Sequence, residues 1–196
     1  MYDSQRRKAD LIVSHASKIR SAALREDKAA LLHAALAAHV AAWDAYVKAV
    51  VAHKYSVVSD PTALGYSVLR AIAEERMKAS AKKLNTPNSE NTRTFMMESS
   101  QFDPWPSWTN VTFGKDIITS SLNVRERINE IFHVRHSFSH GFPMPAYTWN
   151  QDSSGATALN STSLRSVSSF FESIVSKTDV AYSIHIATTF AISRPW

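Results

Sequence analysis

The run from Ala29 to Ala52 constrains the fold of this chain more than any other feature of its sequence. Alanine and leucine dominate the run, and these residues favour helix and permit close packing on several sides. Four polar side chains interrupt it: His33, His39, Asp44 and Lys48. A membrane span needs about 20 consecutive, predominantly apolar residues, so the run indicates a buried central helix of a soluble protein instead. We expect this helix to begin after the charged segment at 25–28 and to end near Lys54.

Apolar residues at three- and four-residue spacing predict further helices on both sides of this run. The expected helices cover residues 2–24, 59–84, 123–141 and 162 onward. Asp60 followed by Pro61 is typical of a helix start. Asn123 with Glu126 resembles a capping box at the start of another helix. Gly141 suits the position just after a helix end.

Residues 85–110 interrupt the helical pattern, because they hold three prolines and two tryptophans. We expect an aromatic loop packed on the body of the protein, with a short helix at 89–99. The last helix is expected to bury one apolar stripe: Leu164, Val167, Phe171, Ile174, Ile184 and Ala187. The sequence holds no strand pattern longer than a few residues and no internal repeat. It therefore predicts an all-α protein, a single domain over 1–196 with four to five main helices in an antiparallel bundle.

Composition excludes several classes of chemistry. Cysteine is absent, which removes thiol nucleophiles, cysteine-ligated zinc, iron–sulfur clusters and disulfides, and fits a reducing compartment. The four glycines form no GxGxxG, GxxxxGK[ST] or GxSxG pattern, which excludes the common nucleotide-binding loops and the usual nucleophile elbow. The formal net charge of +5 suits a polyanionic partner. No secretory signal is recognisable, so we expect a cytoplasmic protein with no membrane partner.

The run Phe132-His-Val-Arg-His-Ser-Phe-Ser-His-Gly141 concentrates three histidines and one arginine near a helix end. One interpretation is a metal site, since His136 and His140 are four residues apart and would face one cation. His133 and His140, however, lie about 10.5 Å apart along a helix axis, too far for both to reach one zinc ion at about 2.0 Å. A metal site would need ligands from elsewhere, and we expect no metal and no cofactor.

The second interpretation is a phosphate site, in which Arg135 and His140 form an R-x4-H pattern. An arginine binds phosphate oxygens and stabilises the extra negative charge of a transition state. A histidine ordinarily titrates near pH 6.5, so it takes a proton from a ribose 2′-hydroxyl or gives one to the leaving oxygen. One histidine does not serve comfortably as both base and acid, but two chains around a two-fold axis would supply two. On a regular helix, positions five apart point about 140° away from each other, so the helix must end or bend near Ser139 for both side chains to face one site.

The run resembles the R-x4-H signature of HEPN domains, and more closely that of the RiboL-PSP-HEPN branch, where a polar residue often follows the arginine and a glycine the histidine. Those positions read Arg135, His136, His140 and Gly141 here. The segment 31–47 is also similar to the family's early central helix, which often carries an acid before an aromatic residue. Asp44, two residues before Tyr46, would be that acid. The resemblance covers about 11–141.

The resemblance implies a HEPN-like helical bundle that forms a homodimer, with two motifs meeting in one cleft, and a metal-independent endoribonuclease. Similar proteins commonly act as toxins or as antiviral effectors. Arg135 and His140 would be catalytic, with His136 and Asp44 in support. Two departures stand out: His136 replaces the family's frequent asparagine, and Phe142 replaces the tyrosine of HEPN toxins that are silenced by nucleotide transfer. The second departure argues against control by an antitoxin of that kind.

Three functional hypotheses follow from these residues. The first is an RNA-cleaving effector, restrained or activated by a partner protein because no sensor domain is recognisable. The second is a non-catalytic HEPN-like module that keeps the motif for dimerisation or partner binding. The third is the histidine metal site. Three tryptophans would stack on bases under the first hypothesis, although packing is their more usual role; they are Trp105, Trp108 and Trp149.

Overall fold

The computed structural model describes residues 2–58, 64–152 and 154–196. Six α-helices account for most of the chain: α1 (Tyr2–Lys18), α2 (Arg25–Val57), α3 (Leu64–Lys83), α4 (Ser89–Ser100), α5 (Ser121–Ser139) and α6 (Ser161–Phe190). Short 3₁₀ helices lie at Ala22–Leu24, Trp105–Ser107 and Thr148–Asn150. A two-stranded antiparallel hairpin, β1 (Val111–Phe113) and β2 (Asp116–Ile118), precedes α5. The all-α prediction is confirmed, with this small hairpin and one more helix than the four to five expected.

The predicted central helix is α2, which contacts each of the other five helices. By length and hydropathy alone, the segment Ala22–Val57 would pass for a membrane span. In the folded chain, however, 56% of its most apolar window is buried inside the protein. The prediction of a buried core helix is therefore confirmed. Trp43, in the middle of α2, is fully buried and donates its indole N–H to the carbonyl of Pro87 at 2.9 Å.

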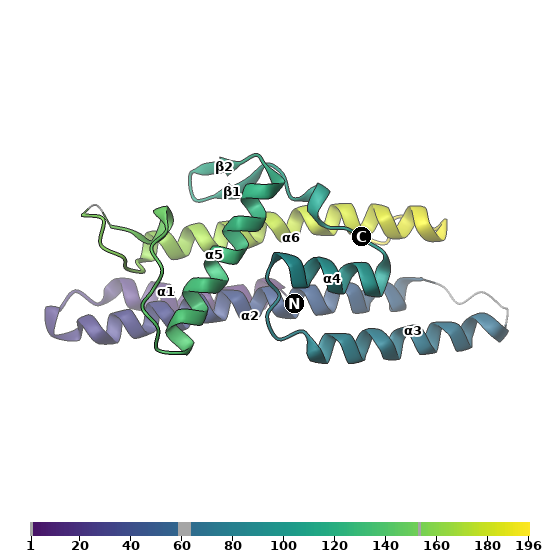
Figure 1. The fold of residues 1–196 in the computed structure, drawn as a ribbon, viewed down its shortest axis with the longest axis horizontal. Coiled ribbons are helices and arrows are strands. Elements are labelled where there is room, and N and C mark those ends of the chain that lie inside the picture. Colours follow the sequence, from purple (N-terminus) through teal and green to yellow (C-terminus); the bar gives the residue numbers. More distant parts are fainter. Residues whose placement is uncertain (1, 59–63, 153) are drawn as a thin grey trace.

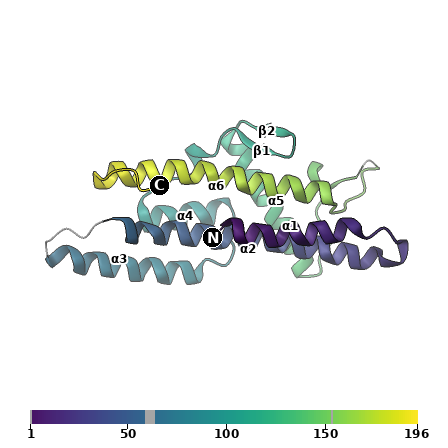
Figure 2. The same ribbon diagram turned by 180° about the vertical axis from the view of Figure 1, so that it is seen from behind.

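Figure 1 shows α2 and α6 running along the length of the molecule, with α5 crossing in front of them and α4 also on this near side. Seen from behind, α1 and α6 are the nearest elements (Figure 2). One continuous core links these layers and extends from Tyr2 in α1 to Ile186 in α6.

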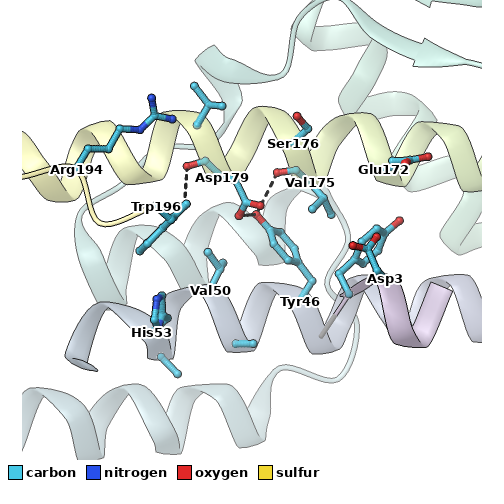
Figure 3. Close-up of a pocket in the computed structure, with 14 residues that line it drawn as sticks. Asp3, Tyr46, Val50, His53, Glu172, Val175, Ser176, Asp179, Arg194 and Trp196 are labelled. Carbon is cyan, nitrogen blue, oxygen red and sulfur yellow. Dashed lines mark hydrogen bonds between the residues drawn. The ribbon is translucent and has the colours of Figure 1, made fainter. Parts of the chain in front are cut away.

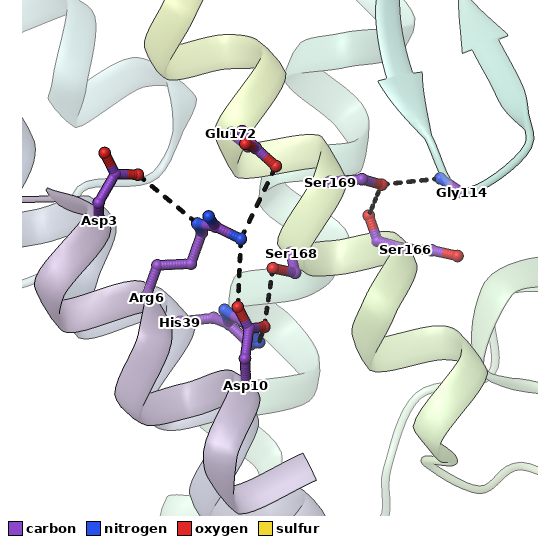
Figure 4. Close-up of polar contacts among 9 residues, drawn as sticks. All are labelled: Asp3, Arg6, Asp10, His39, Gly114, Ser166, Ser168, Ser169 and Glu172. Atoms are coloured by element: carbon purple, nitrogen blue, oxygen red, sulfur yellow. Dashed lines mark hydrogen bonds and ion pairs between the residues drawn. The ribbon is translucent and has the colours of Figure 1, made fainter. Parts of the chain in front are cut away.

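Polar contacts also join three of the helices (Figure 4). Asp10 of α1 accepts a hydrogen bond from Arg6 at 3.1 Å and one from Ser168 of α6 at 2.9 Å. Nε2 of His39, a buried residue of α2, lies 3.8 Å from the same carboxylate. Glu172 of α6 lies 3.8 Å from Arg6. These contacts hold α1 against α2 and α6.

The hairpin is fixed to α6 at its turn. Gly114 has a φ of +63°, and its N–H donates to Ser169 Oγ at 3.0 Å. A Cβ at this position would clash with the side chain of Ser166. Glycine is therefore required both by the left-handed backbone and by the close approach to α6.

Several helix boundaries differ from those predicted. The first helix stops at Lys18 instead of Leu24, and a 3₁₀ turn follows. The helix predicted from Asn123 begins two residues earlier, after Ser120, and its first turn shows no Asn123–Glu126 capping box. The expected start at Asp60 and Pro61 lies outside the described residues.

Along the rest of the chain, α4 agrees with its prediction and α6 agrees only in part. The short helix in 85–110 is present as α4, capped by Asn88, whose side chain accepts from the N–H of Asn91. The α6 stripe is buried through Ile174, but Ile184 is 51% exposed, so that part of the prediction is wrong. Tyr182 and Ile186 face the core instead, because the buried stripe drifts round such a long helix.

Candidate active site

The R-x4-H run lies at the C-terminal end of α5, and the helix ends next to the histidine of this run. His140 is the C-cap residue, and Gly141 follows it with a φ of +69°. The N–H of Gly141 donates to the Phe138 carbonyl, and the N–H of Phe142 donates to the Ser137 carbonyl at 2.8 Å. This pair of hydrogen bonds is the Schellman arrangement, for which a left-handed glycine is the usual solution. The prediction that the helix ends near Ser139 with Gly141 as its stop is confirmed.

Two histidines of the run lie together on the surface. The ring centroids of His136 and His140 are 4.1 Å apart, and both side chains are exposed. Phe142 stacks on His140 with the centroids 6.1 Å apart and is itself 61% exposed. The end of α5 therefore presents imidazole and phenyl rings side by side, where another molecule could contact them.

Arg135 is half-buried at the same end of α5. Its Nε is buried with no hydrogen-bond partner, and no carboxylate in the described parts of the chain forms an ion pair with it. Arg135 and the two histidines thus lie at one helix end, and no ion pair within the described residues neutralises the guanidinium.

Asp44, predicted to orient the motif from the central helix, has another partner. Its Oδ2 accepts from Lys48 Nζ at 2.8 Å, one turn along α2. Its Oδ1 is buried without a partner. Within the described residues, no hydrogen bond or ion pair joins Asp44 to Arg135 or His140.

His33 of α2 contacts the motif segment, although the sequence predicted no role for it in the site. Its ring stacks on Phe138 with centroids 4.1 Å apart and an interplanar angle of 9°. Burial lowers the pKa of His33, so the ring is neutral at physiological pH. Its Nδ1 is buried and has no hydrogen-bond partner. Sequence spacing carried no signal for this contact, because it depends on the angle at which α5 crosses α2.

The third histidine of the run points to a different neighbour. His133 Nδ1 lies 3.0 Å from the hydroxyl of Tyr147, in the loop after α5. No group of three or more His, Asp or Glu side chains among the described residues is arranged to hold a metal ion. Within the described residues, the histidine run therefore has no further side chains that would complete a metal site with it.

A cavity of about 1090 Å³ lies elsewhere, between α2, α6 and the C-terminal tail (Figure 3). Tyr46 lines it and donates to Asp179 Oδ1 at 2.7 Å, and burial raises the pKa of Asp179. Trp196 also lines the cavity, whereas no residue of the R-x4-H run does. The candidate site is thus an exposed helix end and not this cavity.

The three tryptophans considered for base stacking mainly pack within the protein, which is the role that the sequence favoured for them. Trp108 is fully buried, and Trp149 is 8% exposed. Trp105 is half-buried, with the guanidinium groups of Arg93 and Arg125 over its ring.

Comparison with known proteins identifies a family for this chain. The model of the family described as RiboL-PSP-HEPN matches residues 3–183, a span that includes the whole R-x4-H run. No curated protein matches the chain, and no solved structure matches it either.

Proposed function

The chain belongs to the RiboL-PSP-HEPN family, and from this premise we propose that it is a metal-independent endoribonuclease. In this proposal Arg135 and His140 act on the scissile phosphate at a site shared by two copies of the chain. The observation that carries it is the pairing of an unneutralised guanidinium with an exposed imidazole at the end of α5. An arginine without a carboxylate partner keeps its full charge for a phosphate.

The reaction uses the RNA's own 2′-hydroxyl. One His140 accepts the 2′-OH proton while the oxygen attacks phosphorus, and Arg135 stabilises the charge that develops on the phosphate oxygens. The bond from phosphorus to the 5′ oxygen breaks, and that oxygen takes a proton from the partner's His140. The products are a 2′,3′-cyclic phosphate and a 5′-hydroxyl. His136 supports this chemistry through its ring contact with His140.

Two exposed aromatic side chains favour a second copy at this helix end. Phe138 is 52% exposed and Phe142 is 61% exposed, on either side of His140. Large apolar side chains beside a polar site commonly mark an interface. The same surface also suits a non-catalytic dimerisation module, which is the alternative that the test below must separate.

The decisive experiment is digestion of mixed single-stranded RNA in EDTA. The wild type should leave cyclic-phosphate ends, and His140→Ala or Arg135→Ala should lose at least about 100-fold in rate with the helical content unchanged. His15→Ala, at an exposed position of α1, is the matched control and should cleave like the wild type. Intact RNA at every pH and salt concentration, together with weaker self-association in His140→Ala, would support the non-catalytic module instead.

A mixing experiment tests the shared site. Adding an excess of His140→Ala protein should lower the activity of a fixed amount of wild type, because mixed dimers hold only one functional histidine. Activity that stays constant on mixing would mean that each copy works alone.

We further propose a cytoplasmic toxin or antiviral role, with a partner protein that restrains or activates the enzyme. Growth arrest on expression, relieved by His140→Ala, is the expected cellular result. Normal growth with the active wild-type enzyme would contradict a toxin role.

A further inference from the structure

Trp105, in the 3₁₀ turn after α4, lies against two arginines. The guanidinium carbon of Arg93 is 4.4 Å from the ring centre, and that of Arg125 is 4.1 Å from it. Arg93 belongs to α4 and Arg125 to α5. We call these three residues the Trp105 cluster. It lies near the start of α5, whereas the R-x4-H run lies at the other end of the same helix.

Hydrogen bonds fix the position of Trp105. Its Nε1 donates to the Ser89 carbonyl at 3.2 Å, and its backbone N–H donates to Asp103 Oδ1 at 3.1 Å. Its carbonyl accepts from the Ser121 hydroxyl at 2.7 Å. The Nε1 hydrogen bond holds the ring itself, and the other two hold the backbone of Trp105. Trp105 is therefore a well-placed support for the two guanidinium groups that lie against its ring.

The two arginines differ in how their charge is compensated. Arg93 donates twice to Asp103 Oδ2, at 2.9 and 2.8 Å. Arg125 donates only through Nε, to the Ser121 carbonyl at 3.4 Å. Its two terminal nitrogens have no hydrogen-bond partner in the described parts of the chain. Asp103 interacts with this half-buried guanidinium only through space, so its donors remain available to another group. Two cations and one carboxylate leave the Trp105 cluster with an excess of one positive charge.

Arg125 lies on the same face of α5 as the histidines of the candidate site. Arg125, Asn129, His133, His136 and His140 follow one another at spacings of four, four, three and four residues. Such spacing keeps all five within about 80° around a regular helix. Fifteen residues separate the first from the last, or about 22 Å along the axis. In Figure 1 this helix crosses the near side of the molecule beside α4.

We propose that Arg125, supported by Trp105 and with Arg93 beside it, binds a backbone phosphate of the RNA a few nucleotides from the bond that is cleaved. This proposal rests on the ribonuclease function proposed above and identifies the substrate as a single strand long enough to reach both ends of α5. Single-stranded nucleic acid is commonly bound by arginine charge and by aromatic or guanidinium planes. Between the two sites, Asn129 Nδ2 donates to the Glu90 carboxylate oxygens at 3.2 and 3.4 Å. Because Asn129 is engaged in this way, the proposal assigns only one phosphate, the one at Arg125.

The test compares two substrates, a dinucleotide and a mixed-sequence single-stranded RNA of roughly ten nucleotides. For the wild type, kcat/KM should be higher for the long substrate. Arg125→Gln should lower kcat/KM for the long substrate roughly tenfold and leave the dinucleotide rate unchanged, since only the long strand reaches Arg125. Arg165→Gln, at an exposed site on α6, removes the same charge elsewhere and should leave both rates unchanged.

Salt dependence provides a second readout. The slope of log Kd against log salt for the long RNA should fall by about one in Arg125→Gln. Arg125→Lys keeps the charge and should retain that slope while losing part of the affinity, and it also serves if the glutamine variant folds poorly. Equal losses on both substrates, or an equal effect of Arg165→Gln, would overturn the proposal.

Binding separates this proposal from the proposed function. The long RNA, labelled with fluorescein, is titrated by anisotropy against His140→Ala protein with and without Arg125→Gln. A roughly tenfold weaker Kd with Arg125→Gln would support the phosphate site even if the wild type cleaved nothing, in which case only the ribonuclease proposal fails. Equal Kd values would overturn the phosphate site while leaving cleavage by the wild type unaffected.

Discussion

Replacing His39 by leucine should make this protein less sensitive to acid. His39 is 1% exposed in the middle of α2, and neither of its ring nitrogens has a hydrogen-bond partner. Burial lowers the pKa of His39 to about 4, while the nearby Asp10 carboxylate opposes that shift and Arg6 adds to it. The folded protein therefore keeps this ring neutral at a pH where an unfolded chain would protonate it.

The sign and size of the effect follow from proton linkage. In the unfolded chain a histidine titrates near pH 6.5, so between pH 6.5 and 4 the unfolded state binds more protons and acid favours unfolding. With the folded value of about 4, this one residue should cost about 2 kcal/mol of unfolding free energy between pH 7 and 5. Above pH 7 its effect vanishes. Leucine, which has no proton to bind, should remove this loss.

The assay is urea unfolding of the wild type and His39→Leu at pH 7.5, 6 and 5, followed by circular dichroism and tryptophan fluorescence at one protein concentration. At pH 7.5 the variant should be at least as stable, because a buried ring without partners is replaced by an apolar side chain of similar size. His15→Gln, at an exposed position of α1, is the control and should follow the wild type. Parallel loss of stability in the wild type and His39→Leu from pH 7.5 to 5 would refute the argument that His39 is buried as a neutral ring.

Three further changes test the local architecture by thermal or urea unfolding. Gly141→Ala should destabilise the protein by about 1 kcal/mol; a Cβ there meets no other atom, so the whole cost comes from the positive φ. Gly141→Asn should cost less, because asparagine tolerates this backbone conformation better. Equal stability of the wild type and both variants would contradict backbone strain at this position. Asn160→Ala removes a capping box with Ser163 and should cost about 1 kcal/mol; unchanged stability would mean that the α6 start is not held by its cap. Trp108→Phe removes a buried hydrogen bond of 2.9 Å to Thr178 and leaves a cavity, so a cost of about 2–4 kcal/mol is expected, and a loss below 1 kcal/mol would show that the core readily repacks.

The candidate site was predictable only in its local part. The R-x4-H spacing with Gly141 predicted a helix that ends at His140, because a left-handed glycine satisfies the last carbonyls of a helix through short-range hydrogen bonds. The stacking of His33 on Phe138 could not be predicted in this way, since it joins residues about a hundred positions apart. For Asp44, the i,i+4 spacing to Lys48 was a visible signal, and the structure contains that ion pair.

The sequence by itself determined the helical class, the central position of the 29–52 run and the helix stop at Gly141, because periodicity and capping act within a few residues of the chain. The start of α5 was missed by two residues, since Ser120 begins that helix without a side-chain cap. Only the tertiary structure decided how α5 crosses α2, that His33 of α2 stacks on Phe138, and that Trp105 supports Arg93 and Arg125. These features depend on long-range packing, in which the burial of many apolar side chains outweighs any single local preference.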